Sequence, residues 1–379
     1  MRVLAVWPYP PWPSTTGTQR RLARLSEELA HHVELSLVVT GPGEMAGVPA
    51  GIAVAGQVRG RRRPGRAVAG MAHALRVGEP LFTGFFRRRD AIRALREQLD
   101  RWQPDVVWAH GLAGDTVVRG VVPPAQTVLD LSDAEHLRFL RLAEVAGPAR
   151  AALWRVDARR VRTWAAERLP GLRAVSVVSD DDREAYAALA PAARFVVVPN
   201  GVDARPHPRP DPGGAQLVFL GDFGYPPNAQ ALGWFVSDVL PRTPSIDRVV
   251  AVGRGDPPRD PRVEPTGFVD DLDDVWRRCV AMVVPVTSGG GTRLKVLDAM
   301  GAGVPVVSTA FGVGGIGAVP DVHYLRAETA ESFADACTRA ITDVGLRRRV
   351  AAGAHDLVRE RFAWSACLAP LLPVLDSQH

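Results

Sequence analysis

Short apolar runs alternate along this chain with longer stretches of helical periodicity. Each run is bounded by turn-forming residues, which is typical of strands that are buried on both faces. Strands that alternate with helices indicate parallel α/β domains, in which binding loops follow the carboxyl ends of the strands. In the first half, the pattern predicts strands at Arg2–Trp7, His32–Val39, Asp105–Ala109, Gln126–Leu131 and Ala174–Val178, and helices at Gln19–Ala30, Ala91–Trp102 and Ala151–Arg168.

A second series of the same kind begins after a proline-rich stretch, Arg205–Gly214. Proline lacks an amide donor and disrupts helix and sheet, so we interpret this stretch as a hinge or linker. Near the end of the chain, Leu357–Val374 resembles a terminal helix that Pro370 and Pro373 interrupt. The second series predicts strands at Gln216–Leu220, Arg248–Val252, Val280–Val284 and Val304–Ser308, and helices at Asn228–Val239, Asp271–Cys279, Thr292–Met300 and Ala330–Thr342.

The length of the chain also supports two domains. A single hydrophobic core usually stops growing at a smaller size than 379 residues. We therefore predict a first α/β domain over residues 1–204, a linker over 205–214 and a second α/β domain over 215–360. Residues 361–379 are expected to form a helical segment that could return to the first domain.

The composition is that of a soluble globular protein, with 46% hydrophobic residues and no apolar run of membrane-spanning length. Prolines break the N-terminal apolar run, MRVLAVWPYPPWP, before it could serve as a secretory signal, so we expect a cytoplasmic location. The three cysteines, Cys279, Cys337 and Cys367, are far apart, which indicates neither a disulfide framework nor a zinc site. We expect them to be packing residues.

Charge gives only a weak indication of partners. A net charge of +5 is small for this length and does not indicate a nucleic-acid-binding protein. Two basic clusters, Arg59–Arg66 and Arg87–Arg89, have the composition of solvated surface loops. The alternative is contact with a lipid surface or an anionic acceptor, so a peripheral membrane contact stays open. The sequence does not determine the oligomeric state.

The most informative stretch is Ser288–Gly303, which reads SGGGTRLKVLDAMGAG. It follows a predicted strand closed by Pro285 and leads through glycines into a helix whose apolar residues share one face. Glycines let a backbone approach a ligand closely, and the unpaired amides of the next helical turn favour an anion. The pattern therefore predicts a phosphate-binding loop that contains Gly289, Gly290, Gly291 and Thr292.

Two cations, Arg293 and Lys295, occupy the first turn of that helix, where each opposes the helix dipole by about 0.3–1 kcal/mol. An anionic ligand would offset this cost, and a nucleoside diphosphate has a suitable size. The alternative is that Lys295 and Asp298 form an ordinary surface pair worth about 0.2–0.5 kcal/mol, and that the glycines form a simple turn. The two cations at an unfavourable position favour the ligand site.

Six motifs occur in order along most of the chain. They are TGTQRRL at Thr16–Leu22, VVSDDDREAY at Val177–Tyr186, VVPNGVD at Val197–Asp203, FLGDFGYPPN at Phe219–Asn228, TGFVDDL at Thr266–Leu272 and SGGGTRLKVLDAMGAGVPVVST at Ser288–Thr309. With them the chain resembles the retaining glycosyltransferases of family 4, and in particular a subgroup with a GGGTRLK donor loop. The resemblance implies the GT-B fold, with two Rossmann-like domains whose parallel sheets face a central cleft.

The resemblance implies transfer of a hexose-like unit from a nucleoside diphosphate sugar, with UDP as the working choice of nucleotide, to a hydroxyl-bearing acceptor. It also implies retention at the anomeric carbon without a bound metal, so no cofactor is expected. The second domain would hold the donor and the first domain the acceptor. Arg293, Lys295 and the loop amides would stabilise the leaving diphosphate. Gly221 and Asp222 would lie beside the donor, and Asp298 would hydrogen-bond its ribose hydroxyls.

The donor loop departs from the family pattern. Members usually carry two glutamates eight positions apart, and here Gly290 and Asp298 occupy those positions. The arginine and lysine that many members carry after the first strand of the second domain are also absent, and Asp222 is among the residues found there instead. The subgroup with a GGGTRLK loop has the same arrangement, so the two loop cations would replace them. Donor identity is the property that these departures leave undetermined.

In the first domain, the resemblance points to residues near strand ends. Gly17 would bring the backbone close to the donor phosphate, although a turn glycine gives the same signal. His110 corresponds to a family histidine near the reacting sugar, whereas a lone histidine at a strand end is often structural. Asp130 and Asp133 would orient acceptor or sugar hydroxyls, and helix capping is the alternative for Asp133. Asn200 is expected to shape the connection between the domains.

Three functions fit these residues. The first is an active retaining glycosyltransferase, the second is a sugar-nucleotide epimerase or hydrolase of the same fold, and the third is a non-catalytic nucleotide-binding module. Glycine at position 290 in place of a carboxylate slightly favours the latter two. A glycan, a lipid-linked molecule or a small natural product could be the acceptor, and the sequence does not distinguish them.

Overall fold

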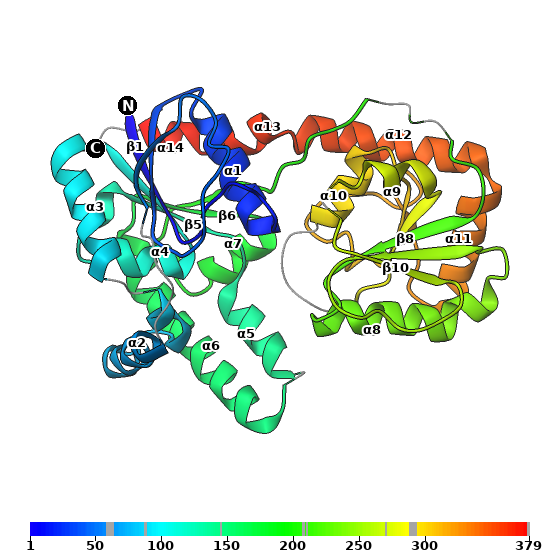
Figure 1. Cartoon of the computed structure of the whole chain (residues 1–379), viewed down its shortest axis with the longest axis horizontal. Helices are drawn as coiled ribbons and strands as arrows, with labels where there is room; N and C mark the ends of the chain where they lie inside the picture. Colours follow the sequence, from blue (N-terminus) through cyan, green and yellow to red (C-terminus); the bar gives the residue numbers. More distant parts are fainter. Residues whose placement is uncertain are drawn as a thin grey trace. The chain divides into compact units, whose positions relative to one another are not determined.

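The computed structural model describes residues 1–57, 64–86, 89–144, 146–206, 209, 211–269, 271–287 and 294–376. These residues form two compact units, each built around a parallel sheet (Figure 1). Unit 1 contains the described residues of Met1–Asn200 and Cys367–His379, and unit 2 contains those of Gly201–Gly289 and Arg293–Ala366. The chain therefore leaves unit 1 after Asn200 and returns to it after Ala366.

Unit 1 has a seven-stranded sheet with the order β3-β2-β1-β4-β5-β6-β7, and its neighbouring strands are parallel. The central strands β4 and β5 are buried along their whole length, as expected for a parallel sheet that is covered on both faces. The strands are β1 Arg2–Trp7, β2 Glu34–Val39, β3 Ala53–Gln57, β4 Val106–His110, β5 Thr127–Leu131, β6 Ala174–Val177 and β7 Phe195–Val197. The helices are α1 Gly17–Leu29, α2 Pro64–Val77, α3 Arg89–Trp102, α4 Gly111–Val118, α5 Glu135–Glu144, α6 Pro148–Arg168, α7 Asp180–Ala187 and α14 Leu372–Asp376.

Unit 2 has a six-stranded sheet with the order β10-β9-β8-β11-β12-β13, again with parallel neighbours. Its strands are β8 Gln216–Leu220, β9 Arg248–Val252, β10 Val263–Gly267, β11 Ala281–Val284, β12 Val306–Ser308 and β13 Leu325–Arg326. Its helices are α8 Pro226–Trp234, α9 Asp273–Arg278, α10 Leu294–Gly301, α11 Ala330–Thr342 and α12 Val344–Arg361. A short helix, α13 Trp364–Leu368, spans the point where the chain returns to unit 1.

Each sheet has one switch point, at which the order of its strands reverses. In unit 1 the reversal lies between β1 and β4, and in unit 2 it lies between β8 and β11. At such a point the loops after the two strands diverge, which leaves a crevice at their carboxyl ends where open α/β sheets bind ligands. The predicted α/β class with two Rossmann-like domains is therefore confirmed.

The strands that the sequence analysis did not predict are β3, β7, β10 and β13, and these are the four edge strands of the two sheets. Edge strands are covered less completely, as the exposed pattern of β10 and the half-buried pattern of β7 illustrate. The predicted helix over Leu357–Val374 was wrong at its start, because α12 already begins at Val344. The first turns of α12 contain an arginine cluster, so the sequence did not indicate a buried helix there. Arg347 of this cluster is nevertheless buried and donates to Ala340 O and Asp211.

The proline-rich segment after residue 204 is attached to unit 2 by hydrogen bonds. Arg205 N donates to Gly301 O at 2.8 Å, and His355 Nε2 donates to Arg205 O at 2.8 Å. Further along, Arg347 Nη2 lies 2.7 Å from each carboxylate oxygen of Asp211. Charged side chains and backbone groups therefore hold a segment whose prolines prevent regular structure.

The last described residues are bonded to unit 1. Arg173 Nε donates to Val374 O at 2.9 Å, and Arg173 Nη2 donates to Leu375 O at 2.7 Å. These bonds satisfy carbonyl groups at the end of α14. Among the described residues, no helix combines the length and the apolar character needed to cross a bilayer.

Candidate functional site

The candidate site in unit 2 lies at its switch point, around the side chain of Lys295. This residue is in the first turn of α10, and its Nζ donates to Leu220 O at 2.9 Å and to Asn228 Oδ1 at 3.0 Å. The ammonium also lies 5.0 Å from the centroid of the Phe219 ring. Leu220 is the last residue of β8, so the cation is held at the carboxyl end of that strand.

The next helical turn carries Asp298, which is buried with an exposure of 9%. A residue enclosed to this degree does not belong to a solvated surface, so the alternative of an ordinary surface pair with Lys295 has little support. Residues 288–293, which precede α10, lie outside the described residues. They include the predicted ligand contacts Gly289, Gly290, Gly291, Thr292 and Arg293.

The backbone after β8 passes very close to the backbone after β9. A Cβ atom on Gly253 would lie 1.7 Å from Gly221 O, and Gly253 has a φ of +147°, so glycine is required there. A Cβ atom on Gly221 would lie 2.8 Å from the side chain of Asn228, which is one of the acceptors that hold Lys295. Asp222 accepts a hydrogen bond from Gly224 N at 2.8 Å and thereby closes the turn. Asn228 therefore connects Lys295 with Gly221 and Asp222, the two residues that were predicted to lie beside the sugar nucleotide.

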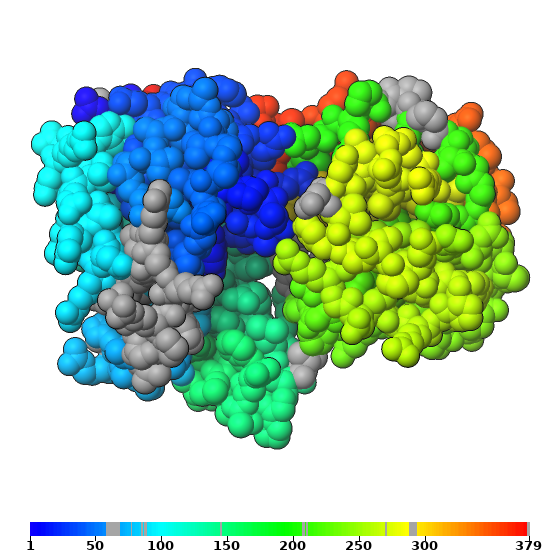
Figure 2. Space-filling view, in the orientation of Figure 1, coloured from blue at the N-terminus to red at the C-terminus, as the bar shows by residue number. Residues whose placement is uncertain are grey.

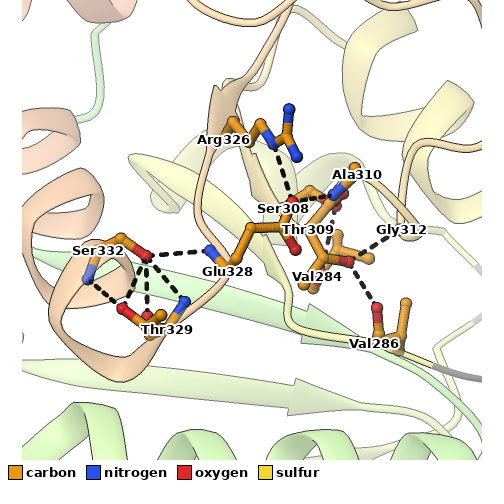
Figure 3. A network of polar contacts seen from close by, with 10 residues as sticks. All are labelled: Val284, Val286, Ser308, Thr309, Ala310, Gly312, Arg326, Glu328, Thr329 and Ser332. Carbon is orange, nitrogen blue, oxygen red and sulfur yellow. Dashed lines mark hydrogen bonds and ion pairs between the residues drawn. The ribbon is translucent and has the colours of Figure 1, made fainter.

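A set of hydrogen bonds joins the carboxyl ends of β11 and β12 (Figure 3). Ser308 Oγ donates to Val284 O at 3.2 Å, and Thr309 Oγ1 donates to Val286 O at 2.5 Å. Gly312 N donates back to Thr309 Oγ1 at 2.9 Å. These bonds fix the residues that lead from β11 towards the glycine-rich stretch.

The candidate site in unit 1 lies beside its switch point and contains His110 and Asp130. His110 ends β4, Asp130 is its partner in the register of β5, and Ser176 is the partner of Asp130 in β6. The three side chains form one row, in which His110 Nδ1 lies 2.7 Å from Asp130 Oδ2 and Ser176 Oγ donates to Asp130 Oδ1 at 2.8 Å. The register of the sheet therefore brings residues from three separate strands together.

Arg21 of α1 completes this cluster. Its Nη2 lies 2.6 Å from Asp130 Oδ1, and its Nε lies 3.1 Å from Asp130 Oδ2. Its Nη1 donates to Pro199 O at 3.1 Å and to Asn200 Oδ1 at 2.9 Å. The side chains of Arg21 and Asp130 are 1% and 0% exposed, so this is a fully buried ion pair.

The charge state of Asp130 follows from these contacts. Burial alone would raise the pKa of this carboxyl, but the charge of Arg21 and the hydrogen bonds from His110 and Arg21 together hold it well below its usual range. Asp130 is therefore an anion that only accepts hydrogen bonds, so Nδ1 of His110 carries the proton. With an exposure of 0%, Asp130 contacts protein groups, and the predicted direct contact with substrate hydroxyls has little support.

Gly17 and Asp133 occupy two further positions at helix starts. Gly17 is the exposed first residue of α1, after the N-cap Thr16, so its amide is among those left unpaired by the helix. Helix capping is not the role of Asp133, since Ala134 N donates to Asp182 Oδ1 and Glu135 N donates to Tyr186 Oη. Burial, followed by the charge of Glu135, raises the pKa of Asp133 to about 7.

Residues 214–343, which make up most of unit 2, match the family model of the glycosyl transferases group 1. The second unit is similar to these transferases. The match covers about a third of the chain and includes Lys295 and Asp298. No curated protein matches the chain by sequence.

Solved structures are similar to the whole chain. Sucrose-phosphate synthase from Thermosynechococcus elongatus has a TM-score of 0.72 at 16% identity, covering 99% of this chain and 98% of that one. HepE of Anabaena, solved with UDP and glucose, has a TM-score of 0.68 at 13% identity and covers 100% of both chains. The lipopolysaccharide outer core galactosyltransferase WaaB, in its apo form, has a TM-score of 0.62 at 14% identity and covers 99% of both. The fold is therefore GT-B.

Several residues of the two candidate sites were not singled out from the sequence. Arg21 belongs to the motif TGTQRRL, yet only the glycine of that motif was singled out. A signal was present, because Arg21 precedes Leu25 by four residues and so lies on the buried face of an amphipathic helix. Ser176 and Asn228 gave no comparable signal, since their importance depends on strand register and on a close approach of loops.

Proposed function

We propose that this protein is a retaining, metal-independent glycosyltransferase that uses a nucleoside diphosphate sugar. The observation that carries the proposal is the position of Lys295, whose ammonium lies at the carboxyl end of β8 within the region similar to the glycosyl transferases. A cation held at the switch point of an open α/β sheet is suited to a diphosphate. HepE was solved with UDP and with UDP-glucose, so UDP is the first nucleotide to test.

In the proposed reaction, the bond between the anomeric carbon and the diphosphate oxygen breaks, and the diphosphate takes the bonding electrons. The acceptor oxygen bonds to the same face of the sugar, and its proton passes to the leaving diphosphate. Lys295, together with Arg293 and the amides of residues 289–292, stabilises the charge that develops on the diphosphate. Asp298, one helical turn after Lys295, hydrogen-bonds the ribose hydroxyls. These roles need no side chain that acts as a nucleophile.

In unit 1, His110 is the side chain proposed to contact the transferred sugar. Its Nδ1 hydrogen is directed to Asp130, so Nε2 is the ring nitrogen left to form a hydrogen bond with a sugar hydroxyl. Gly17, at the start of α1, offers a backbone amide suited to a phosphate oxygen. Asp133, whose carboxyl has a raised pKa, is a candidate for contact with acceptor hydroxyls.

The nucleotide site is tested by calorimetry with UDP on Lys295→Ala. A hydrogen bond to a charged group contributes about 1.5–3 kcal/mol, so the dissociation constant should rise about 10- to 100-fold. Arg248→Ala is the matched control, because it removes an exposed cation from β9 of the same unit. Unchanged affinity in Lys295→Ala would contradict the assignment of the diphosphate site. Arg293→Ala is expected to behave like Lys295→Ala.

Analysis of the reaction products distinguishes the three candidate functions. Proton NMR of the product should show an anomeric coupling that matches the donor sugar if a retaining transferase acts on an added acceptor. Release of free sugar without an acceptor would indicate a hydrolase, and a changed sugar still attached to the nucleotide would indicate an epimerase. Binding of UDP with no conversion of any UDP-sugar would indicate a binding module.

A peripheral membrane contact remains part of the proposal. The predicted basic clusters lie largely outside the described residues. Another candidate surface is formed by α5 and α6, coloured teal to green at the bottom of Figure 2, which carry exposed arginines and exposed apolar side chains. Leu140, Leu153 and Val156 are 39%, 56% and 39% exposed there. Apolar side chains among arginines suit an anionic lipid surface. The exposed arginines of the two helices are Arg141, Arg150, Arg155, Arg159 and Arg162.

Vesicle sedimentation tests this contact. The protein should pellet with phosphatidylglycerol vesicles more than with phosphatidylcholine vesicles, and Leu153→Glu should reduce the pelleted fraction. Equal sedimentation with both lipids would argue against the contact. A positive result would favour a lipid-linked acceptor over a soluble one.

A further inference from the structure

Asn228 has no role in the function proposed above, yet both ends of its side-chain amide are hydrogen-bonded. Its Oδ1 accepts from Lys295 Nζ at 3.0 Å, and its Nδ2 donates to Asp222 O at 3.0 Å. The ammonium only donates and the carbonyl of Asp222 only accepts, so the two contacts together determine which end of the amide faces Lys295. Asn228 therefore presents a fixed acceptor to the ammonium.

The backbone around Asn228 holds the side chain in this place. Asn228 is in the first turn of α8, which begins with Pro226 and Pro227, and its N donates to Tyr225 O at 3.0 Å. The backbone angle of proline suits the start of a helix, so this turn is preorganised. On the other side, a Cβ atom on Gly221 would lie 2.8 Å from Asn228 Cγ. The amide therefore lies between the start of α8 and the turn after β8.

The groups that hold the Lys295 ammonium in these contacts carry no net charge. They are Leu220 O at 2.9 Å, Asn228 Oδ1 at 3.0 Å and the Phe219 ring, whose centroid is 5.0 Å from Nζ. Neutral acceptors and an aromatic face attract a cation without cancelling its charge. A carboxylate at position 228 would instead place a negative charge next to the ammonium and weaken its attraction for an anion.

Lys295 is the only lysine of the chain, although lysine and arginine together account for 46 residues. An ammonium is a compact charge on a flexible four-carbon stem, whereas a guanidinium is a planar fork. Two acceptors from different elements and one aromatic face surround a single nitrogen atom here, and this arrangement suits the ammonium. The stem loses rotamer freedom when the ammonium is immobilised. Because the free protein already holds the ammonium, a ligand does not have to supply that cost.

We propose that Asn228 is a positioning residue, which immobilises the Lys295 ammonium at the carboxyl end of β8 and leaves its charge available to an anionic ligand. The identification of that ligand as a nucleoside diphosphate rests on the proposed function. The immobilisation is a property of the protein alone, so it can be measured without a ligand.

Side-chain NMR tests the immobilisation. Protein labelled with nitrogen-15 only at lysine Nζ contains one labelled side chain, so its ammonium signal needs no assignment. In the wild type, the hydrogen bonds to Leu220 and Asn228 should slow the exchange of the ammonium hydrogens with water. Loss of a hydrogen bond to a charged group should make this exchange about 10-fold faster in Asn228→Ala. In Asn228→Asp, which keeps an acceptor at this position, exchange should stay slow.

Calorimetry with UDP tests the consequence for binding. The dissociation constant should rise about 3- to 10-fold in Asn228→Ala. It should rise further in Asn228→Asp, because the carboxylate competes with the diphosphate for the ammonium. In the Lys295→Ala background, Asn228→Ala should change the dissociation constant by less than about twofold, since the group that it positions is gone.

Gln230→Ala is the matched control, because it removes an exposed amide side chain from the same helix. This control should leave both the exchange rate and the UDP affinity unchanged. Circular dichroism accompanies each variant. If Asn228→Ala does not fold, Asn228→Asp supplies the test, with slow exchange and weakened UDP binding as the expected pair of results.

Three results would overturn the inference. They are an unchanged exchange rate in folded Asn228→Ala, UDP binding in the Asn228 variants that equals that of the wild type, and an equal effect of Asn228→Ala with and without Lys295. The last result would indicate a general structural defect instead of positioning of the ammonium. A wild-type protein that binds no UDP, together with the expected exchange rates, would contradict only the proposed function.

Discussion

The buried pair of Arg21 and Asp130 predicts a large stability change for Asp130→Asn. Asparagine has the same shape, but it replaces one acceptor oxygen by an amide donor. In the folded protein, both carboxylate oxygens receive donors, Oδ1 from Arg21 and Ser176 and Oδ2 from Arg21 and His110. The variant would oppose donor to donor and leave the buried guanidinium without its counter-charge. Breaking a buried pair in this way costs about 3–5 kcal/mol.

The expected shift in melting temperature is large enough to measure. A domain of this size changes its midpoint by about 2–4 °C per kcal/mol, so the transition of unit 1 should fall by roughly 6–20 °C. The pKa of Asp130 is lowered in the folded state from its ordinary value of 3.8, so its contribution is complete above that value and is lost as the pH falls below it. The cost of Asp130→Asn should therefore be equal at about pH 6 and pH 8 and should shrink below about pH 4.

Differential scanning calorimetry on Asp130→Asn, Arg21→Met and the double variant provides the measurement. The double variant removes both charges, so it should be less destabilised than the sum of the single variants by about 2 kcal/mol or more. Glu264→Gln breaks the exposed pair with Arg248 and should cost at most about 1 kcal/mol. A loss below about 1 kcal/mol in Asp130→Asn, or additive single effects, would refute the reasoning.

Three further predictions concern other parts of the protein. The pKa of Asp133 is raised to about 7, so its ionisation destabilises the fold increasingly from about pH 4 to pH 7. Asp133→Asn should therefore raise the melting temperature at about pH 8 and leave it unchanged at about pH 4. An equal shift at both pH values would contradict the raised pKa. Gly312→Ala should lower the free energy of unfolding by about 1–3 kcal/mol in urea titrations, because its Cβ would lie 2.2 Å from Ser308 Oγ and 2.9 Å from Val284 O. UDP at about 100 times its dissociation constant should stabilise the folded protein by about 2.7 kcal/mol in a thermal-shift assay, and EDTA should leave transfer unchanged; no shift, or activity lost to the chelator, would count against the proposed function.

The central strands of both sheets were predictable because burial on both faces imposes a continuous apolar sequence. All the strands that were missed lie at sheet edges, where the coverage is incomplete. The strand β13 has only two residues, which no periodicity could reveal. Helix starts were harder to predict where a charged residue is buried, as at Arg347, because hydropathy assigns such a residue to the surface.

The candidate site residues also differ in whether the sequence alone could reveal them. Lys295 was recognisable because a cation in the first turn of a helix contradicts the local electrostatics and so calls for a ligand. Asn228, which accepts a hydrogen bond from Lys295, was not recognisable from the sequence, because the approach of α8 to the end of β8 depends on the packing of unit 2. His110 was singled out by its position after a strand, but its proton could not be assigned until Asp130 was found beside it.

The sequence by itself determined the α/β class with two Rossmann-like domains, and it predicted a glycine-rich stretch in which a sugar nucleotide could be held. These properties follow from local periodicity and from residue types that conflict with their local environment. Only the tertiary structure decided that Asp130 is enclosed and bonded to Arg21 and Ser176. The reason is that strand register places Ser176 beside Asp130 at a distance of 46 positions along the chain, while α1 brings Arg21 to Asp130 across 109 positions. No local pattern records which elements become neighbours.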